Sequence, residues 1–495
     1  MKLFLSRAVA LIAIVVWTSR APADGPYLGN GIKSGEATPS SIIIWTRLTE
    51  KPDISPEGVE WPKVRPNKQD DGSFHFPGPQ IPEGHTLNDM AYTLPGAPGE
   101  VRLRYRSQAL DSDADAVTEW TAVNDGADFT HQFTLEGLRP GTVYAFDMEA
   151  RATGSTTPSD QVSGTFRTVP APDATSPATF TVVTGQDFWL RDDDKNGHKI
   201  YAEMRKLAPD FFVHTGDIVY FDRERPWAVN AEQARHKWHR MFALPFQRDF
   251  HNHTTSYFLR DDHETWQDDA WPTLQNNKMG DLTYADGVEI FFEQVPGPDR
   301  EKPWRTVRWG RDLQIWLVEG RDFRSANTDP DGPEKTIWGA EQKAWFKKTV
   351  EESDATFRVL ISPTPVVGPD RETKADNHAN QAFAHEGSEL RQFMAEQKNM
   401  VVVCGDRHWQ YVSTDPETGL REFCSGPSSD AHAGGFSEDQ RTDMHQYLAV
   451  IGGFLAGTVE RKDGTPTLTF RHYDVNGAMV YEESLTQDGI LGAPK

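Results

Sequence analysis

Hydrophobic and polar positions follow two different patterns along the chain. Between residues 101 and 170, apolar and polar residues alternate in VRLRYRSQAL, HQFTLEGLRPGTVYAFDMEARA and QVSGTFRTVP. Such alternation is typical of antiparallel strands that bury one face. The segment GIKSGEATPSSIIIWTRL, residues 31–48, ends in a β-branched run that predicts an earlier strand. We therefore expect an all-β sandwich at residues 24–172, with a surface excursion at residues 51–99, where chain breakers are frequent.

A different pattern begins after the linker APDATSP, residues 171–177. Apolar runs now stand alone between long polar or helical stretches: TFTVVT, DFFVHT, SYFLR, LQIWLV, FRVLIS and MVVVC. Runs of this kind suit strands buried on both faces, as in an α/β layered domain. The segments LTFRHYDV and MVYEES near the C-terminus suit strands that extend a sheet edge. We therefore predict an α/β domain at residues 178–485.

Residues 1–23 have the features of a secretory signal peptide. Lys2 and Arg7 precede an apolar run at residues 8–17, and APA at residues 21–23 supplies the small residues that signal peptidase recognises. The apolar run is too short to cross a membrane, and no later run is long enough. Because no adjacent pair of arginines is present, the segment predicts Sec-type export to the periplasm, cell surface or exterior.

Composition and charge narrow the class of protein. With 495 residues, 37% of them hydrophobic, the chain can fill more than one core. The net charge of -23 opposes loose binding to nucleic acid or anionic lipid, and no nucleic-acid-binding motif is present. The GxSxG, Walker A and HExxH motifs are also missing. Cys404 and Cys424 can pair in an oxidising compartment or serve as small buried residues, and both alternatives stay open.

Four buried runs lead directly into polar motifs. TFTVVT is followed by GQD, DFFVHT by GDIVY, SYFLR by DDHE and MVVVC by GDRH. Ligands of open α/β sheets bind at the carboxyl ends of the strands, so these distant motifs can converge. One such motif alone is more often an ordinary turn, whereas four together favour a shared site.

The residue types in these motifs suit a metal site. Asp217 can bridge two cations, because each carboxylate oxygen keeps spare lone pairs. Tyr220 can offer a phenolate, a hard ligand for ferric iron, or can be a packed aromatic residue. Asp262 would contact the second cation. His263 would protonate the leaving alkoxide, a role worth roughly 10²–10⁴ in rate. Alternatively, DDHE only opens a helix.

GDRH places Asp406 and His408 on the same side of an extended segment, so each can hold one metal. The alternative is a surface loop with an ion pair to Arg407. Two cations would activate a bound water and stabilise the charge of the transition state. The sequence therefore predicts a metal-dependent phosphoric ester hydrolase that uses metal-activated hydroxide on a small-molecule or polymer phosphate ester.

The order GDxxY, DDHE and GDxH, after SGxxTPxSIxxWTRL, resembles the PhoD-type alkaline phosphatases and phosphodiesterases of the calcineurin-like metallophosphoesterase superfamily. IWGAEQKAWF at residues 337–346 and EGRDFR at residues 319–324 are similar to segments of the same family. LEGLRPGTVY at residues 135–144 resembles the tyrosine corner of fibronectin type III sandwiches. The resemblance covers almost the whole mature chain. It implies a fibronectin-like N-terminal sandwich and an α-β-β-α sandwich after it.

The resemblance also implies the cofactors. The site would hold Fe³⁺ and one or two Ca²⁺, with Asp217 bridging and Tyr220 on the iron. Asp262, Asp406 and His408 would complete the ligand set.

One departure concerns the first motif. Family members usually carry Ser-Cys-Gln there, with the cysteine on iron, whereas this chain has glycine at position 185. Either Asp187 reaches the metal or the ligand position is vacant, and other divalent metals stay possible. Arg321 either clamps phosphate or forms a structural ion pair. A second interpretation is a binding protein of the cell surface, catalytically weakened by Gly185.

Overall fold

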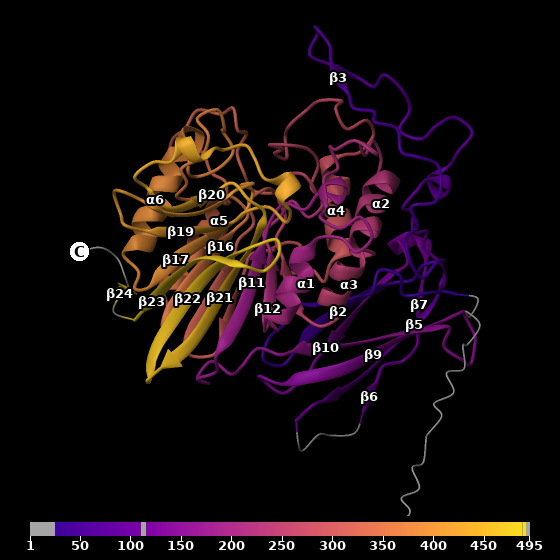
Figure 1. The fold of residues 1–495 in the computed structure, drawn as a ribbon, viewed down its shortest axis with the longest axis horizontal. Coiled ribbons are helices and arrows are strands. Elements are labelled where there is room, and N and C mark those ends of the chain that lie inside the picture. Colours follow the sequence, from indigo (N-terminus) through magenta and orange to yellow (C-terminus); the bar gives the residue numbers. More distant parts are fainter. Residues whose placement is uncertain (1–24, 110–114, 488, 492–495) are drawn as a thin grey trace, which may run out of the picture.

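The computed structural model describes residues 25–109, 115–487 and 489–491, so the predicted signal peptide lies outside the described residues. The fold is built mainly from β-sheets (Figure 1). The largest has ten strands, in the spatial order β24 (Gly489–Leu491), β23 (Met479–Thr486), β22 (Thr465–Asp474), β21 (Gly453–Lys462), β11 (Ala178–Val183), β12 (Phe211–His214), β13 (Thr255–Phe258), β1 (Ile32–Gly35), β2 (Ile42–Arg47) and β8 (Thr130–Leu135).

Three further sheets are present in the described part of the chain. The second has seven strands, in the order β14 (Arg305–Trp309), β15 (Leu313–Leu317), β16 (Phe357–Ser362), β17 (Met400–Cys404), β19 (Arg421–Ser425), β18 (Gln410–Thr414) and β20 (His445–Ala449). The third runs β10 (Asp160–Arg167), β9 (Val143–Arg151), β5 (Gly99–Ser107) and β6 (Ala116–Val117), with β7 (Thr121–Val123) also on β5. The last is the hairpin of β3 (Asn67–Lys68) and β4 (Phe74–His75).

The isolated apolar runs form the parallel strands at the centre of the two large sheets. β11, β12, β13 and β1 are parallel neighbours in one sheet, and β15, β16, β17 and β19 in the other. All six runs are confirmed as strands, and LTFRHYDV and MVYEES lie in β22 and β23 near one edge. Parallel strands of this kind place their carboxyl ends at a common edge, where the polar motifs follow.

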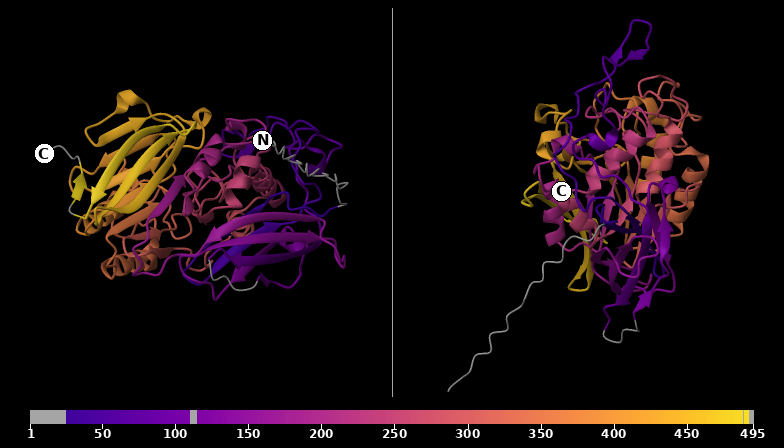
Figure 2. Two further views of the ribbon diagram at one scale, coloured as in Figure 1. Left: turned by 60° about the horizontal axis from the view of Figure 1, so that its bottom comes forward. Right: turned by 90° about the vertical axis from the view of Figure 1, so that its right-hand side faces the viewer.

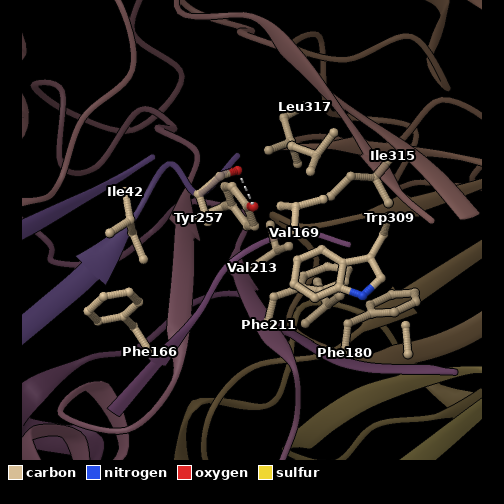
Figure 3. Close-up of a cluster of buried hydrophobic side chains, with 14 of the residues drawn as sticks. Ile42, Phe166, Val169, Phe180, Phe211, Val213, Tyr257, Trp309, Ile315 and Leu317 are labelled. Carbon is tan, nitrogen blue, oxygen red and sulfur yellow. Dashed lines mark hydrogen bonds between the residues drawn. The ribbon is translucent and has the colours of Figure 1, made fainter. Parts of the chain in front are cut away.

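The two large sheets pack face to face through apolar side chains (Figure 3). The ring centroids of Phe211, from β12, and Trp309, from β14, lie 4.7 Å apart across the interface. Alternate residues point to the opposite face, so Phe212 joins a separate cluster beneath helices. That cluster contains α1 (Lys199–Lys206), α2 (Ala231–Phe242), α3 (Pro245–His251) and α4 (Tyr284–Gln294). The outer face of the seven-stranded sheet packs against α5 (Gly339–Glu351) and α6 (Ala384–Ala395).

The first strands of the chain extend the ten-stranded sheet. β1 pairs in parallel with β13, Ser34 opposite Thr255, so hydrogen bonding crosses the boundary predicted at residues 172–178. β5, β9 and β10 pack on β1 and β2 and lie at the opposite end of the molecule from β22 and β23 (Figure 2). The backbone N–H of Arg139 donates to the Tyr144 hydroxyl at 2.8 Å, the contact expected of a tyrosine corner. The domain boundaries themselves stay a prediction.

The excursion after β2 protrudes from the molecule at the β3–β4 hairpin (Figures 1 and 2). It is anchored where the backbone N–H of Trp227 donates to Gln80 Oε1 at 2.9 Å. Cys404 and Cys424 are free, buried thiols on the neighbouring strands β17 and β19, the second of the two alternatives above. Within the described residues, no helix is long and apolar enough to span a membrane.

Candidate active site

The polar motifs meet at a cavity of about 780 Å³ at the carboxyl edge of the parallel strands. The predicted site residues that line it are Asp187, Asp217, His263, Asp406 and His408. They follow β11, β12 and β13, which are neighbours in the ten-stranded sheet, and β17, which belongs to the seven-stranded sheet packed against it. The convergence on which the metal-site hypothesis depends is therefore present.

Asp217, Tyr220 and His408 contact one another, and Asp217 and His408 line the cavity. The Tyr220 hydroxyl donates to Asp217 Oδ2 at 2.9 Å and lies 3.0 Å from His408 Nε2. His408 Nε2 lies 3.6 Å from the same carboxylate oxygen. Asp217 Oδ1 is buried and has no hydrogen-bond partner among the described residues. A buried carboxylate oxygen without a donor is costly unless a cation or water binds it.

Asp262 and His263 complete a possible metal-binding group with Asp217. The ligand atoms of these three side chains all lie within 4.8 Å of one another. Burial raises the pKa of Asp217 well above its ordinary value; His263 opposes this shift, and the charge of Asp262 adds to it. Crowded buried carboxylates of this kind require positive charge, which metal ions supply.

His263 is held by a carboxylate that the sequence analysis missed. Its Nδ1 lies 2.6 Å from Asp222 Oδ1, and the other oxygen of Asp222 accepts from the backbone N–H of Asp268. Burial lowers the pKa of His263, but the Asp222 carboxylate and its neighbours outweigh burial and raise that pKa well above the ordinary value. Asp222 thus orients the imidazole, and the raised pKa favours the protonated form that a proton donor needs.

Asp406 reaches the cavity from the loop after β17. Its backbone N–H donates to Thr184 Oγ1 at 3.0 Å, and its carboxylate contacts the guanidinium of Arg407. Arg407 is fully buried and also pairs with Asp370 at 3.1 Å, so the ion pair to Arg407 that the alternative interpretation named is present, but in a buried segment and not in a surface loop. Asp217 and Asp406 both have left-handed backbone, with φ of +57° and +62° respectively. Strained backbone at these two positions is typical of functional sites.

In the motif GQD, which follows β11, residue 185 is a glycine and offers no side chain as a metal ligand. A Cβ added to Gly185 would lie 3.1 Å from His408 Nε2 and 3.4 Å from the Tyr220 hydroxyl. A ligand side chain there would thus point at this part of the site. Asp187 also borders the cavity, but its Oδ1 accepts from the backbone N–H of Trp189 at 2.9 Å as the cap of η3 (Phe188–Leu190).

Arg321 lies outside the cavity walls formed by the described residues. It is fully buried, and its Nε donates to Asp261 Oδ1 at 2.5 Å, while another guanidinium nitrogen donates to the Ala270 carbonyl at 3.2 Å. This geometry favours the ion-pair alternative for Arg321. Other cations border the cavity instead: Arg65, Arg223, Arg225, Lys278, Arg371 and Lys374. They come from four segments that lie far apart in the sequence, because Arg223 and Arg225 share one loop and Arg371 and Lys374 share another.

A second carboxylate group lies beside the first. Asp262, Asp268 and Asp269 place ligand oxygens within 4.8 Å of one another. Lys374 contacts Asp269 at 2.5 Å, so part of this charge is neutralised within the protein. The sequence signal available for this group was the Asp-Asp pair at residues 268–269, which starts seven residues after the beginning of DDHE.

Facing sheets under helices, with carboxylates and imidazoles gathered at the carboxyl ends of parallel strands, define a metallophosphoesterase-like fold. A solved structure described as "Structure of PhoD" has the same fold, with a TM-score of 0.70, 15% identity and coverage of 97% of this chain and 94% of that chain. Purple acid phosphatase PPD1 from yellow lupin (Lupinus luteus) seeds matches with a TM-score of 0.61 at 12% identity, over 92% of this chain and 74% of that one.

The chain belongs to the PhoD-like phosphatase family. The model of that family matches residues 180–451, more than half of the chain, and the model of its N-terminal domain matches residues 15–170. Alkaline phosphatase D of Bacillus subtilis (strain 168) is 22% identical over 263 residues, which are 46% of this chain and 43% of that protein. The match thus spans less than half of the relative's length. The predicted family is confirmed.

Proposed function

We propose that the chain is an exported, metal-dependent phosphoric ester hydrolase with a dinuclear or multinuclear site. The observation that carries the proposal is the convergence of Tyr220, Asp262 and His408 on the Asp217 carboxylate, whose other oxygen, Oδ1, is buried with no partner in the described structure. Membership of the PhoD-like phosphatase family supports the same activity, as does the relative named alkaline phosphatase D.

The donor set fits two or more cations. Asp217, Tyr220 and His408 would hold one ion, for which phenolate and carboxylate favour Fe³⁺. Asp217, Asp262 and Asp406 would hold another, and an all-carboxylate set favours Ca²⁺. The missing donor at Gly185 leaves other divalent metals open. When bound, such ions activate a water as nucleophile and stabilise the charge of the phosphoryl transition state.

The protein's own residues would orient and protonate the substrate. His263, fixed by Asp222, would give its proton to the leaving oxygen of the ester. Arg223 and Lys374, which border the cavity, would hold the phosphate oxygens in an otherwise acidic molecule. The proposed substrate is a small-molecule or polymer phosphate ester.

The organisation proposed for the chain is a signal peptide at residues 1–23, a fibronectin-like sandwich at residues 24–172 and an α-β-β-α phosphoesterase domain at residues 178–485. Export through the Sec pathway follows from the signal-peptide pattern. The competing function is a cell-surface binding protein of the same fold with weakened catalysis, which the side-chain-free position Gly185 favours.

Elemental analysis and ester hydrolysis by one purified sample test the proposal. We expect bound metal, a violet or brown colour from phenolate bound to iron, and cleavage of 4-nitrophenyl phosphate or its diester that ends on chelation and returns with metal. A colourless, calcium-only protein without hydrolysis would contradict the hydrolase and support the binding protein instead.

A further inference from the structure

His432 places a buried imidazole at the cavity from an element that contains none of the predicted ligands. It ends η5 (Asp430–His432), in the segment after β19, and only 6% of the residue is exposed. Its Nδ1 lies 3.2 Å from the Gly185 carbonyl oxygen, so Nδ1 carries the proton and donates it. In this neutral tautomer, Nε2 keeps a lone pair that can bind a metal.

The Nε2 atom of His432 is buried, and the described residues offer it no hydrogen-bond partner. Its ring centroid lies 4.1 Å from that of His408 and 5.1 Å from that of Tyr220, and the residue borders the cavity. An imidazole nitrogen without a partner in such a place is costly unless it binds a metal or a water. The structure therefore places an unpartnered imidazole nitrogen on a residue beside His408 and Tyr220 of the proposed metal site.

Two other residues, Gly185 and Asp187, are less suitable as the metal ligand that the first motif lacks. Gly185 has no side chain, and the space next to it already contains His408 and Tyr220. One oxygen of Asp187 accepts from the Trp189 backbone. By contrast, the hydrogen bond that fixes His432 uses Nδ1 only and leaves Nε2 for another partner.

We infer that His432 Nε2 is a further metal ligand of this cavity and supplies the donor that position 185 lacks. The inference rests on the metal site of the proposed function. Imidazole suits Zn²⁺, Fe and other first-row transition metals. A histidine here would thus shift the metal preference of the site away from that of a thiolate ligand. The alternative is a purely structural role, in which His432 only ties η5 to the Gly185 carbonyl.

Two substitutions separate a ligand from a structural residue. In His432→Asn, the amide nitrogen takes the place of Nδ1 and can still donate a hydrogen bond to the Gly185 carbonyl. The variant has no atom in the place of Nε2, so the lone pair that would bind the metal is lost. In His432→Gln, the longer side chain brings an amide group to the place of Nε2. His445 is a matched control, because it is also buried with an unpartnered Nε2 and is not among the described residues that line the cavity.

The mature protein and its variants are stripped with chelator and titrated with Co²⁺, whose visible absorption reports the number and kind of ligands. We expect His432→Asn to weaken Co²⁺ binding about tenfold or more and to change the band shape, since even the loss of an outer-shell partner of a metal ligand costs about 10–100-fold in affinity. His432→Gln should bind between wild type and His432→Asn, and His445→Ala should bind as wild type does. Thermal unfolding of the metal-free proteins establishes that each is folded.

Wild-type affinity and spectrum in His432→Asn would overturn the inference, as would an equal loss in His445→Ala. If His432→Asn does not fold, His432→Gln decides by the same criterion of a weakened and altered band. Failure of the proposed function is distinguishable. A wild-type protein that binds Co²⁺ through His432 but hydrolyses no phosphate ester with any metal would support His432 as a metal ligand and would contradict the proposed hydrolase function.

Discussion

Replacing His263 with alanine should slow the hydrolysis of alkyl phosphates far more than that of 4-nitrophenyl phosphate. An alkoxide leaving group needs a proton in the transition state, whereas nitrophenolate leaves with little assistance. General acid catalysis is worth roughly 10²–10⁴ in rate. That range corresponds to about 2.7–5.4 kcal/mol of transition-state stabilisation, at 1.36 kcal/mol for each factor of ten. We expect this full loss for the alkyl ester and about tenfold or less for the nitrophenyl ester.

Asp222 allows a second test of proton donation by His263. This carboxylate lies 2.6 Å from His263 Nδ1 and is outside the group of possible metal ligands around Asp217. Its orienting effect and its contribution to the raised pKa of His263 therefore persist when cations neutralise the other carboxylates. Asp222→Asn should reproduce the leaving-group dependence at reduced size, since a buried charged hydrogen bond contributes about 1.5–3 kcal/mol.

The assay compares kcat/KM for the two esters in wild type, His263→Ala and Asp222→Asn, with metal content measured on the same samples. His253→Ala, a histidine outside the described cavity walls, should leave both rates unchanged. An equal loss for both esters in His263→Ala would refute proton donation. Loss of bound metal in that variant would make His263 a ligand, the other role that its position next to Asp217 and Asp262 allows.

The other predictions concern the metal centre, the buried ion pair and acid stability. Asp217→Asn and His408→Ala should each abolish metal-dependent hydrolysis in folded protein; near-normal turnover in either would contradict the metal assignment. Arg321→Met should lower the free energy of unfolding in urea by about 3–5 kcal/mol, because Asp261 keeps a buried charge without its partner; a change below about 1 kcal/mol would oppose the structural role. Burial lowers the pKa of His472 to about 4. Below pH about 6.5, His472 therefore binds a proton in the unfolded chain but stays neutral in the folded protein. About 3 kcal/mol of the free energy of unfolding is lost by pH about 4. His472→Gln should remove this part of the pH dependence of urea unfolding.

The central strands could be predicted because strands that are buried on both faces consist of uninterrupted apolar runs, such as FRVLIS and MVVVC. The pairing of β1 with β13 could not. Ser34 and Thr255 meet through backbone hydrogen bonds, which carry no residue-specific signal across a gap of this length in the sequence. The N-terminal strands were thus predicted as strands, while their continuity with the ten-stranded sheet was not.

The candidate metal site was predictable to the extent that its residues follow closely after strand ends. Asp217 and His408 do so, and the edge of a parallel sheet brings such positions together. Asp222 and Lys374 lie deeper in loops whose path depends on packing, so no spacing rule identified them. Arg321 lies in a segment with a family-like pattern, yet its guanidinium points to Asp261, and this contact is visible in the structure and not in the sequence.

Gly185 shows why a missing donor is easier to find in a sequence than its replacement. The nearest candidate along the chain is Asp187, two residues away, but one of its oxygens caps η3. His432 is 247 positions away and contacts the Gly185 carbonyl directly, with its second nitrogen unpartnered within the described structure. Proximity in the sequence therefore favours a carboxylate, whereas the fold favours an imidazole. Because the two donors select different metals, the ion held at the proposed site would depend on this contact between the loop after β11 and the segment after β19.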